Sequence, residues 1–140
     1  MNEATRSRLP IPPASINPDS AQHFQGLQEG KLLLPRCDRC SIVFWYPRHH
    51  CPACGANTVS WLAASGKGLI YSFTVVRKGS GPYAEVGPYA LAYVELDEGV
   101  RVLSNITDVT DIQSLTIGMP VKAVFDREPG TPVLLRFRPL

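Results

Sequence analysis

The stretch that decides the fold is Cys37-Asp-Arg-Cys40-Ser-Ile-Val-Phe-Trp-Tyr-Pro-Arg-His-His-Cys51-Pro-Ala-Cys54-Gly55, which contains all four cysteines of the 140-residue chain. They form two C-x-x-C pairs separated by ten residues. Two residues between cysteines allow one tight turn to direct both thiolates at a single point. Two such turns predict a tetrahedral site of four sulfurs from Cys37, Cys40, Cys51 and Cys54, with structural Zn²⁺ as the expected metal.

Other uses of these cysteines fit the sequence less well. Two disulfides are typical of a secreted chain, and a thioredoxin-like redox pair needs only one C-x-x-C. Iron in a rubredoxin-like site uses the same four thiolates, so zinc and iron both remain open. His49 and His50 precede the second pair, but four thiolates already fill a tetrahedral site. Because a filled site has no open position for substrate, the metal is expected to stabilise the fold and not to catalyse.

The composition is that of a globular, β-rich protein with 44% hydrophobic and 19% charged residues. Thirteen prolines and eleven glycines favour strands and turns over a helical bundle. No apolar run approaches the roughly 18–20 residues of a transmembrane helix. The first residues lack the apolar segment of a signal peptide. Paired thiolates without an export signal predict a cytoplasmic protein that does not associate with membranes.

The formal net charge of +2 conceals a segregation of charge along the chain. Residues 31–82 carry seven basic residues against Asp38, a net charge of +6, and residues 85–111 carry six acidic residues against Arg101, a net charge of −5. The basic part is suited to nucleic acid, to the phosphates of a cofactor such as coenzyme A, or to an acidic protein partner. Scattered, solvated surface charge is the alternative.

Three segments are expected along the chain. Residues 1–18 are rich in proline and predict an extended or disordered arm. Residues 19–64 predict a helix and the zinc ribbon, with a short helix over 22–29 that Asp19 or Ser20 caps and Gly30 ends. Residues 65–140 predict a barrel.

The strand pattern supports this division. Ribbon strands are expected at 31–36, 42–46 and 58–62. Five further strands are expected at 68–78, 89–96, 100–106, 121–125 and 133–138, and alternate residues Leu69, Tyr71, Phe73 and Val75 of the first fit one face. The fold class is therefore mainly β. We expect a five-stranded OB-type Greek-key barrel, with a sandwich or a different small barrel as the alternatives.

Residues 22–138 resemble a bacterial and archaeal family of small proteins, often described as acyl-CoA-associated, in which an N-terminal helix and a rubredoxin-like zinc ribbon precede an OB-fold. The shared features run through the helix, the ribbon and the barrel in the same order and spacing. They are Phe24, Leu27, Glu29-Gly30-Lys31-Leu32, Cys37-x-x-Cys40, Phe44, Pro47-Arg48, Cys51-Pro52-x-Cys54-Gly55, Trp61, Ser65-Gly-Lys-Gly68, Tyr71-Ser-Phe-Thr-Val75, Pro88-Tyr89, Val94-Glu-Leu-Asp-Glu-Gly99 and Ile117-Gly-Met-Pro-Val121. Ser41 departs from the glycine that the family commonly has after the first knuckle.

The resemblance implies an accessory subunit that is not itself an enzyme. Such proteins bind a thiolase, a lipid-transfer-type thiolase or aldolase, a hydroxymethylglutaryl-CoA synthase-like acyltransferase or a hydratase. They stabilise that enzyme, or bridge two active sites and help to hold the coenzyme A portion of an acyl intermediate. The sequence agrees with this role, because it has no spare cysteine for a thioester and no evident Ser/His/Asp set. The interface is expected to include Phe24, Leu27, Phe44, Trp45 and Tyr46, which alternatively form the core that joins ribbon to barrel.

Two alternatives to the accessory role remain. A stand-alone acyl-CoA-binding protein would meet the phosphates of its ligand with Lys67, Arg77 and Lys78, because Gly66 and Gly68 let backbone N–H groups approach closely. A nucleic-acid-binding protein is possible because zinc ribbons and OB-folds both serve that purpose, with Tyr71 and Phe73 as stacking platforms. The acidic segment 85–111 argues against nucleic acid.

Overall fold

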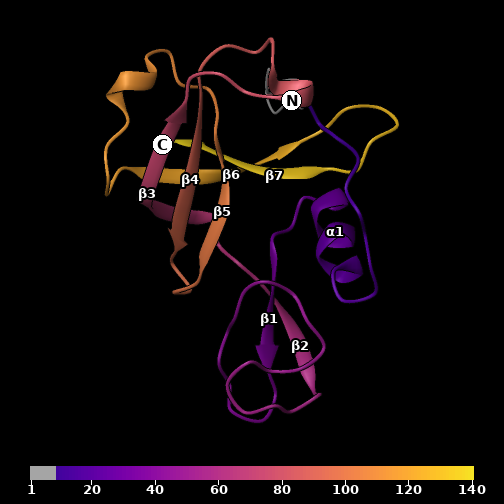
Figure 1. Cartoon of the computed structure of the whole chain (residues 1–140). Helices are drawn as coiled ribbons and strands as arrows, with labels where there is room; N and C mark the ends of the chain where they lie inside the picture. The colour runs from indigo at the N-terminus through magenta and orange to yellow at the C-terminus, as the bar shows by residue number, and fades with distance from the viewer. Residues whose placement is uncertain (1–8) are drawn as a thin grey trace.

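Five strands close into a barrel in the computed structural model, which describes residues 9–140 (Figure 1). They are β3 (Lys67–Val76), β4 (Tyr89–Leu96), β5 (Arg101–Ile106), β6 (Pro120–Asp126) and β7 (Leu134–Pro139). Their order around the barrel is β3-β4-β5-β7-β6. All neighbours pair antiparallel except β5 and β7, which meet in parallel at Ile106 and Phe137. The predicted OB-type barrel is therefore confirmed.

The ribbon contains one antiparallel pair, β1 (Leu33–Cys37) and β2 (Val59–Ala63), with Leu33 opposite Ala63 and Cys37 opposite Val59. The strand expected at 42–46 does not form, and only a single bridge joins Val43 to Arg36. The N–H of Phe44 donates to the carbonyl oxygen of Pro35 at 3.1 Å. Because Pro35 has no N–H to donate in return, the ladder stops there.

Helix α1 (Ala21–Gln28) begins and ends close to the expected bounds. Ser20 occupies the N-cap position, but its hydroxyl bonds to Asn17 and not to a helical N–H group. At the other end Gly30 has a φ of +75°. The N–H of Lys31 donates to the carbonyl of Gly26 at 2.8 Å and that of Gly30 to the carbonyl of Leu27 at 3.1 Å, a Schellman motif that requires the left-handed glycine.

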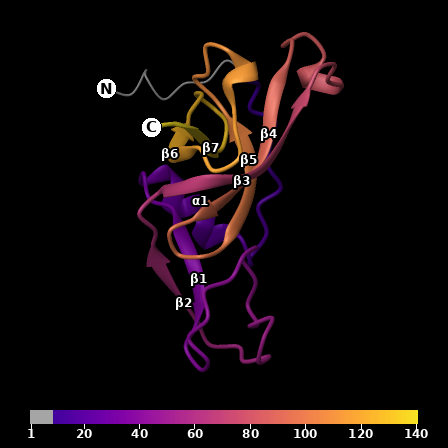
Figure 2. The ribbon, with the colours of Figure 1, turned by 90° about the vertical axis from the view of Figure 1, so that its left-hand side faces the viewer.

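The helix joins the ribbon to the barrel, and it lies beside both in the two views (Figures 1 and 2). A methyl group on Gly26 would come within 2.8 Å of the Leu33 side chain, so the helix backbone packs directly on β1. On the barrel side, the Arg127 guanidinium donates to the carbonyl oxygens of Leu27 and Gln28 at 3.3 Å each. A cation at the carbonyl end of a helix also complements the helix dipole.

The hydrophobic core runs without interruption from the barrel into the base of the ribbon. Leu32 and Leu34 at the start of the ribbon belong to the same buried cluster as the barrel side chains. Those barrel side chains come from all five strands and include Ile70, Val94, Val102, Val121 and Phe137. Ribbon and barrel are thus packed together, as one hydrophobic cluster shared between two sheets.

Strand β3 contains a bulge that changes which side chains face the core. Its pairing with β4 shifts between Ile70 and Ser72. Ile70 is buried, whereas Leu69 and Tyr71 lie on the outer surface and Phe73 packs against the core. The prediction that Leu69, Tyr71, Phe73 and Val75 share one face is therefore wrong, because the extra residue of a bulge reverses the alternation of side chains.

The described part of the N-terminal arm crosses the barrel in an irregular, extended path. Leu9 and Ile11 are buried, and between them the carbonyl oxygen of Pro10 accepts a hydrogen bond from Arg136 at 2.7 Å. Arg136 is itself buried and also donates to Asp126 at 3.2 Å and to the side chain of Asn105. A buried charge needs such partners to offset its desolvation. The remainder of the predicted arm, residues 1–8, lies outside the described residues.

No helix formed by residues 9–140 combines the length and apolar character that crossing a bilayer requires.

His23 packs between the helix and the ribbon. The residue is 4% exposed, and its ring meets the rings of Phe24 and Trp45 edge-on at centroid distances of 5.0 and 4.9 Å. Within the described residues, Nδ1 has no hydrogen-bond partner. Burial lowers the pKa of His23 from 6.5 to about 4, because a charged ring would lose its hydration.

This burial predicts a loss of stability in mild acid. Between pH 6.5 and pH 4 the unfolded chain binds a proton at His23 that the folded chain does not bind. The free energy of unfolding therefore decreases as the pH is lowered, by up to roughly 3 kcal/mol at pH 4. Urea unfolding of wild type and His23→Phe at several pH values measures this loss, and the variant should show a flatter dependence. His50→Phe, at an exposed histidine, is the control and should follow the wild type. Equal slopes for wild type and His23→Phe would contradict the account.

Candidate metal centre and binding surfaces

The four cysteine sulfurs converge on one point at the end of the ribbon. All lie within 4.8 Å of one another, and the Sγ atoms of Cys37 and Cys54, and of Cys40 and Cys51, are 3.6 Å apart. A metal that binds four sulfurs at about 2.3 Å separates them by about 3.8 Å in a tetrahedron. The donor set and its spacing therefore fit a structural metal, with all four positions of the tetrahedron supplied by the chain.

The two knuckles have the same local geometry. Cys37 Sγ accepts from the backbone N–H of Arg39 and Cys40 at 3.3 and 3.4 Å. Cys51 Sγ accepts from the N–H of Ala53 and Cys54 at 3.3 and 3.5 Å. These hydrogen bonds favour the thiolate form that a metal binds. Each C-x-x-C therefore forms one tight turn, as its spacing predicts.

The protonation of the thiols reflects these contacts. The hydrogen bond from the Cys40 N–H is the main cause that lowers the pKa of Cys37 to about 6. For Cys40, a backbone hydrogen bond with Ile42 lowers the pKa, but desolvation and the neighbouring thiols outweigh it and raise the pKa to about 11. Four adjacent thiolates repel one another, so a cation is needed to hold all of them ionised.

Ser41 and Gly55 occupy equivalent positions after the two knuckles. Their N–H groups donate to the carbonyls of Cys37 and Cys51, each at 2.9 Å. Both have left-handed backbones, with φ of +68° at Ser41 and +79° at Gly55. The turn therefore requires a positive φ, which suits glycine better than serine.

The ribbon histidines lie on the surface and apart from the metal site. His49 Nε2 is 3.0 Å from a carboxylate oxygen of Asp19, and both side chains are about half exposed. Neither His49 nor His50 belongs to the group of potential metal ligands, which within residues 9–140 consists of the four cysteines alone. Their expected place as loop residues agrees with this arrangement.

The predicted interface residues divide into two sets. Leu27 and Phe44 are buried inside the chain, so their assignment to a partner interface is corrected: their side chains do not lie at a surface that a partner could meet. Phe24 and Trp45 are half-buried and Tyr46 is exposed, so these three remain accessible. Trp45 also packs against Tyr46, with ring centroids 5.2 Å apart. The two expectations, a partner interface and a joining core, thus each describe part of this set.

The residues predicted to meet coenzyme A phosphates do not gather at one place. Lys67 begins β3, whereas Arg77 and Lys78 follow its other end, roughly 30 Å away at the usual rise of a strand. Lys67 instead lines a hollow of about 230 Å³ between ribbon and barrel together with Lys31 and Lys122. Sequence reasoning did not identify Lys122, because only the pairing of β3 with β6 places it directly opposite Lys67.

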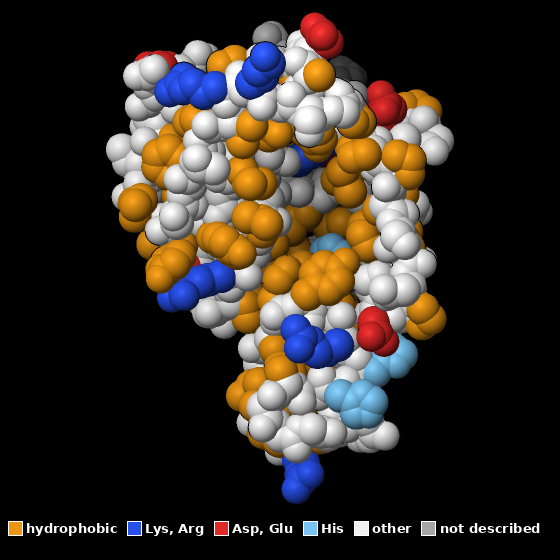
Figure 3. Space-filling view, viewed as in Figure 1, with side chains coloured by type: hydrophobic (Ala, Val, Ile, Leu, Met, Phe, Trp, Pro, Cys, Tyr) orange, Lys and Arg blue, Asp and Glu red, His pale blue; other side chains and the backbone are white. Residues whose placement is uncertain are grey.

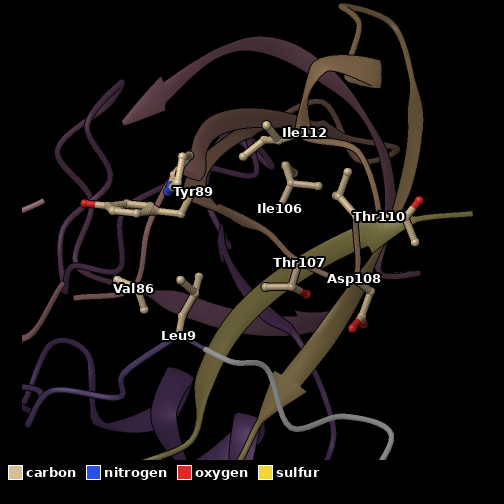
Figure 4. A pocket seen from close by; sticks show the side chains of 10 residues that line it. Leu9, Val86, Tyr89, Ile106, Thr107, Asp108, Thr110 and Ile112 are labelled. Atoms are coloured by element: carbon tan, nitrogen blue, oxygen red, sulfur yellow. The ribbon is translucent and has the colours of Figure 1, made fainter. Parts of the chain in front are cut away.

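A larger hollow of about 730 Å³ lies at the end of the barrel away from the ribbon (Figure 4). Apolar side chains from the arm, the loop before β4 and the segment after β5 surround it, among them Leu9, Val86, Ile106 and Ile112. Its charged lining residue is Asp108. A carboxylate at this position disfavours a phosphate ligand, and none of the predicted phosphate-binding residues lines the hollow.

Replacing Cys37 and Cys40 with serine tests the metal site. The double variant should lose its metal and the fold of the ribbon, because structural zinc contributes roughly 10–16 kcal/mol of binding free energy in zinc-finger peptides, comparable to the whole stability of a domain. Elemental analysis should find one metal ion per wild-type chain and none in the variant, and should distinguish zinc from iron. His49→Gln is the control and should keep its metal. A double variant with unchanged metal content and thermal midpoint would contradict the four-sulfur site.

Several known proteins are similar to this chain in sequence. The "DUF35 domain-containing scaffold protein" of Methanothermobacter thermautotrophicus is 40% identical over 106 residues, which cover 74% of this chain and 79% of that protein. The protein of the same description from Methanocaldococcus jannaschii is 37% identical over 97 residues, covering 69% and 68%. The "Probable enoyl-CoA hydratase alpha subunit" of Thermomonospora curvata is 34% identical over 110 residues, or 79% of this chain, but this chain spans only 34% of that protein.

Two solved structures share the fold. A chain of the "Ltp2-ChsH2(DUF35) aldolase" superposes with a TM-score of 0.81 at 32% identity, covering 90% of this chain and 98% of that chain. A DUF35-family protein of unknown function from Sulfolobus solfataricus has a TM-score of 0.65 at 17% identity, covering 89% and 87%. The second likeness shows the fold alone.

Family models describe both modules of the chain. The model of the ChsH2 rubredoxin-like zinc ribbon matches residues 24–60, and that of the ChsH2 C-terminal OB-fold domain matches residues 61–126. The resemblance that the motifs predicted is therefore confirmed. The chain belongs to the DUF35 family, and in it a ChsH2-type zinc ribbon precedes a ChsH2-type OB-fold.

Proposed function

We propose that this protein is a non-catalytic accessory subunit that binds and stabilises a thiolase-like enzyme acting on acyl-CoA. The observation that carries the proposal is the likeness to a chain of the "Ltp2-ChsH2(DUF35) aldolase", which covers 98% of that chain at 32% identity. The archaeal relatives described as scaffold proteins support the same role.

The similarity to part of a hydratase subunit supports a role inside a larger assembly. This chain corresponds to about a third of the Thermomonospora curvata hydratase alpha subunit. The similarity thus extends both to a short relative, of which 106 matched residues make up 79%, and to a segment of a longer protein. A module that is used in both ways is suited to holding an enzyme component in place.

The residues of this chain also favour support over catalysis. The chain has four cysteines, and all four belong to the metal site, so none is left to carry a thioester. His23 is buried in its neutral form, and His49 is paired with Asp19 on the surface. A general base must reach a substrate at a pKa near the working pH, and His23 does not meet that requirement.

Direct binding of acyl-CoA is the second candidate function. The hollow that Lys31, Lys67 and Lys122 line, which we call the lysine hollow, favours it. Lys31, Lys67 and Lys122 surround one hollow, and Lys67 is directly opposite Lys122 although like charges on facing strands are destabilising. A phosphate group between them would offset this repulsion. Under this proposal the phosphates bind in the lysine hollow and not at Arg77 or Lys78. The same hollow would serve whether the chain binds acyl-CoA by itself or holds the coenzyme A portion of the enzyme's substrate.

Affinity capture from the native cytoplasm, the compartment we propose for this protein, tests the accessory role. The tagged chain is captured at mild salt and retained proteins are identified by mass spectrometry. We expect a thiolase-like enzyme in near-stoichiometric amount, and its loss when a Cys37→Ser/Cys40→Ser chain is used as the unfolded-ribbon control. Capture of nucleic acid, or of no enzyme of this class, would contradict the proposal. Calorimetry with coenzyme A then distinguishes direct binding by wild type from its loss in Lys67→Gln/Lys122→Gln.

A further inference from the structure

Four large hydrophobic side chains are exposed on the outer surface of three neighbouring barrel strands. Leu69 and Tyr71 on β3 and Tyr93 on β4 are each 47% exposed, and Leu103 on β5 is 52% exposed. Tyr93 is directly opposite Leu103 on one side and Ser72, the residue after Tyr71, on the other. Hydrophobic side chains gather over the part of the barrel that these strands form (Figures 1 and 3). We call these four residues the outer tyrosine face.

Polar neighbours hold this face in a defined arrangement. The Arg101 guanidinium carbon lies 3.7 Å from the centre of the Tyr71 ring, and Arg101 Nε is 3.1 Å from Glu95 Oε2. Arg101 and Glu95 face each other across the β4–β5 pair. Tyr71 therefore lies on rigid strands, and the positive charge of the Arg101 that stacks on it is already paired with Glu95. Ordering the face in advance reduces the entropy lost when a partner binds.

The β3 bulge accounts for the exposure of Tyr71. The register shift between Ile70 and Ser72 leaves Tyr71 without a direct partner on β4 and turns it outward. Bulges commonly serve to re-aim a side chain. Large apolar groups that adjoin one another on a soluble protein mark interaction surfaces, and tyrosine and arginine are the residues most enriched among binding hot spots.

From these contacts we infer that the outer tyrosine face is the surface on which the partner enzyme docks. This inference rests on the proposed function and specifies which part of the chain performs it. The occupant is an apolar surface of the folded, thiolase-like enzyme. The likeness to the chain in the Ltp2-ChsH2(DUF35) aldolase extends over 98% of that chain, barrel included, which supports an enzyme as the partner.

The charges around the face favour a protein over nucleic acid. Arg101 is paired with Glu95, and the turn that joins β4 to β5 carries Asp97 and Glu98. Nucleic acid is held mainly by several basic side chains on its phosphates, and these carboxylates would repel it. The barrel is closed, so a partner meets the side chains of the face and does not add a strand to the edge of a sheet.

Substitutions on the face test the inference with the full chain. Tyr93→Thr/Leu103→Thr removes two of the four apolar groups while keeping residues that favour strands. Ile117→Thr is the matched control, because Ile117 is 70% exposed and lies outside the face. The thiolase-like enzyme identified by affinity capture is purified and titrated with each chain by calorimetry. We expect the double variant to bind about 30-fold more weakly, or worse, and the control to stay within about twofold of wild type.

Unchanged metal content and thermal midpoint in both variants show that any loss is local. If wild type and double variant bind the enzyme equally well, the docking surface is wrong while the accessory role stands. If wild type does not bind the enzyme, the proposed function fails, and the inference with it. A wild-type dimer that the double variant dissociates, without any enzyme bound, would overturn the inference by making a second copy the occupant.

Discussion

The convergence of four thiolates on one metal is the constraint on which the ribbon depends. Between residues 37 and 62 the buried side chains are those of Cys37, Phe44, Pro47 and Cys51, which are too few for a core. The metal therefore takes the place of a hydrophobic core and fixes both knuckles at once. From this point β1 and β2 leave in register, and between the two knuckles Trp45 packs against His23 of the helix. Loss of the metal would thus remove the support of one side of the ribbon–helix joint.

The joint makes the ribbon and the barrel a single platform. Leu32 and Leu34 extend the barrel core into the ribbon, Gly26 lets the helix approach Leu33, and Arg127 holds the carbonyl end of the helix. At the far end of the barrel, buried Arg136 fixes the arm at Pro10. A scaffold benefits from such rigidity, because a surface that is already ordered loses little entropy on binding. We accordingly propose that this chain acts by presenting a rigid binding surface to its partner and not by catalysing a reaction.

Local signals in the sequence predicted the metal ligands, the helix and the barrel strands, because cysteine spacing, a glycine stop and alternating hydrophobicity act over a few residues. Features that depend on distant pairing were missed or wrong. The bulge at Tyr71 arises from the register with β4, and Pro35 interrupts a strand at 42–46 that its own composition favours. Leu27 and Phe44 were assigned to an interface because their apolar character does not distinguish a core from a docking surface. Lys67 meets Lys122 and not Arg77 because the barrel closes through β6.

An accessory protein and an enzyme differ in what they do alone, and this difference tests the central claim most directly. The measurement is steady-state turnover of an acyl-CoA substrate by the purified chain, by the thiolase-like enzyme captured with it, and by the two together. The account predicts no turnover by the chain alone, and a more active or longer-lived enzyme when the chain is present. Turnover by the purified chain alone, if it persists through further purification, would contradict the account.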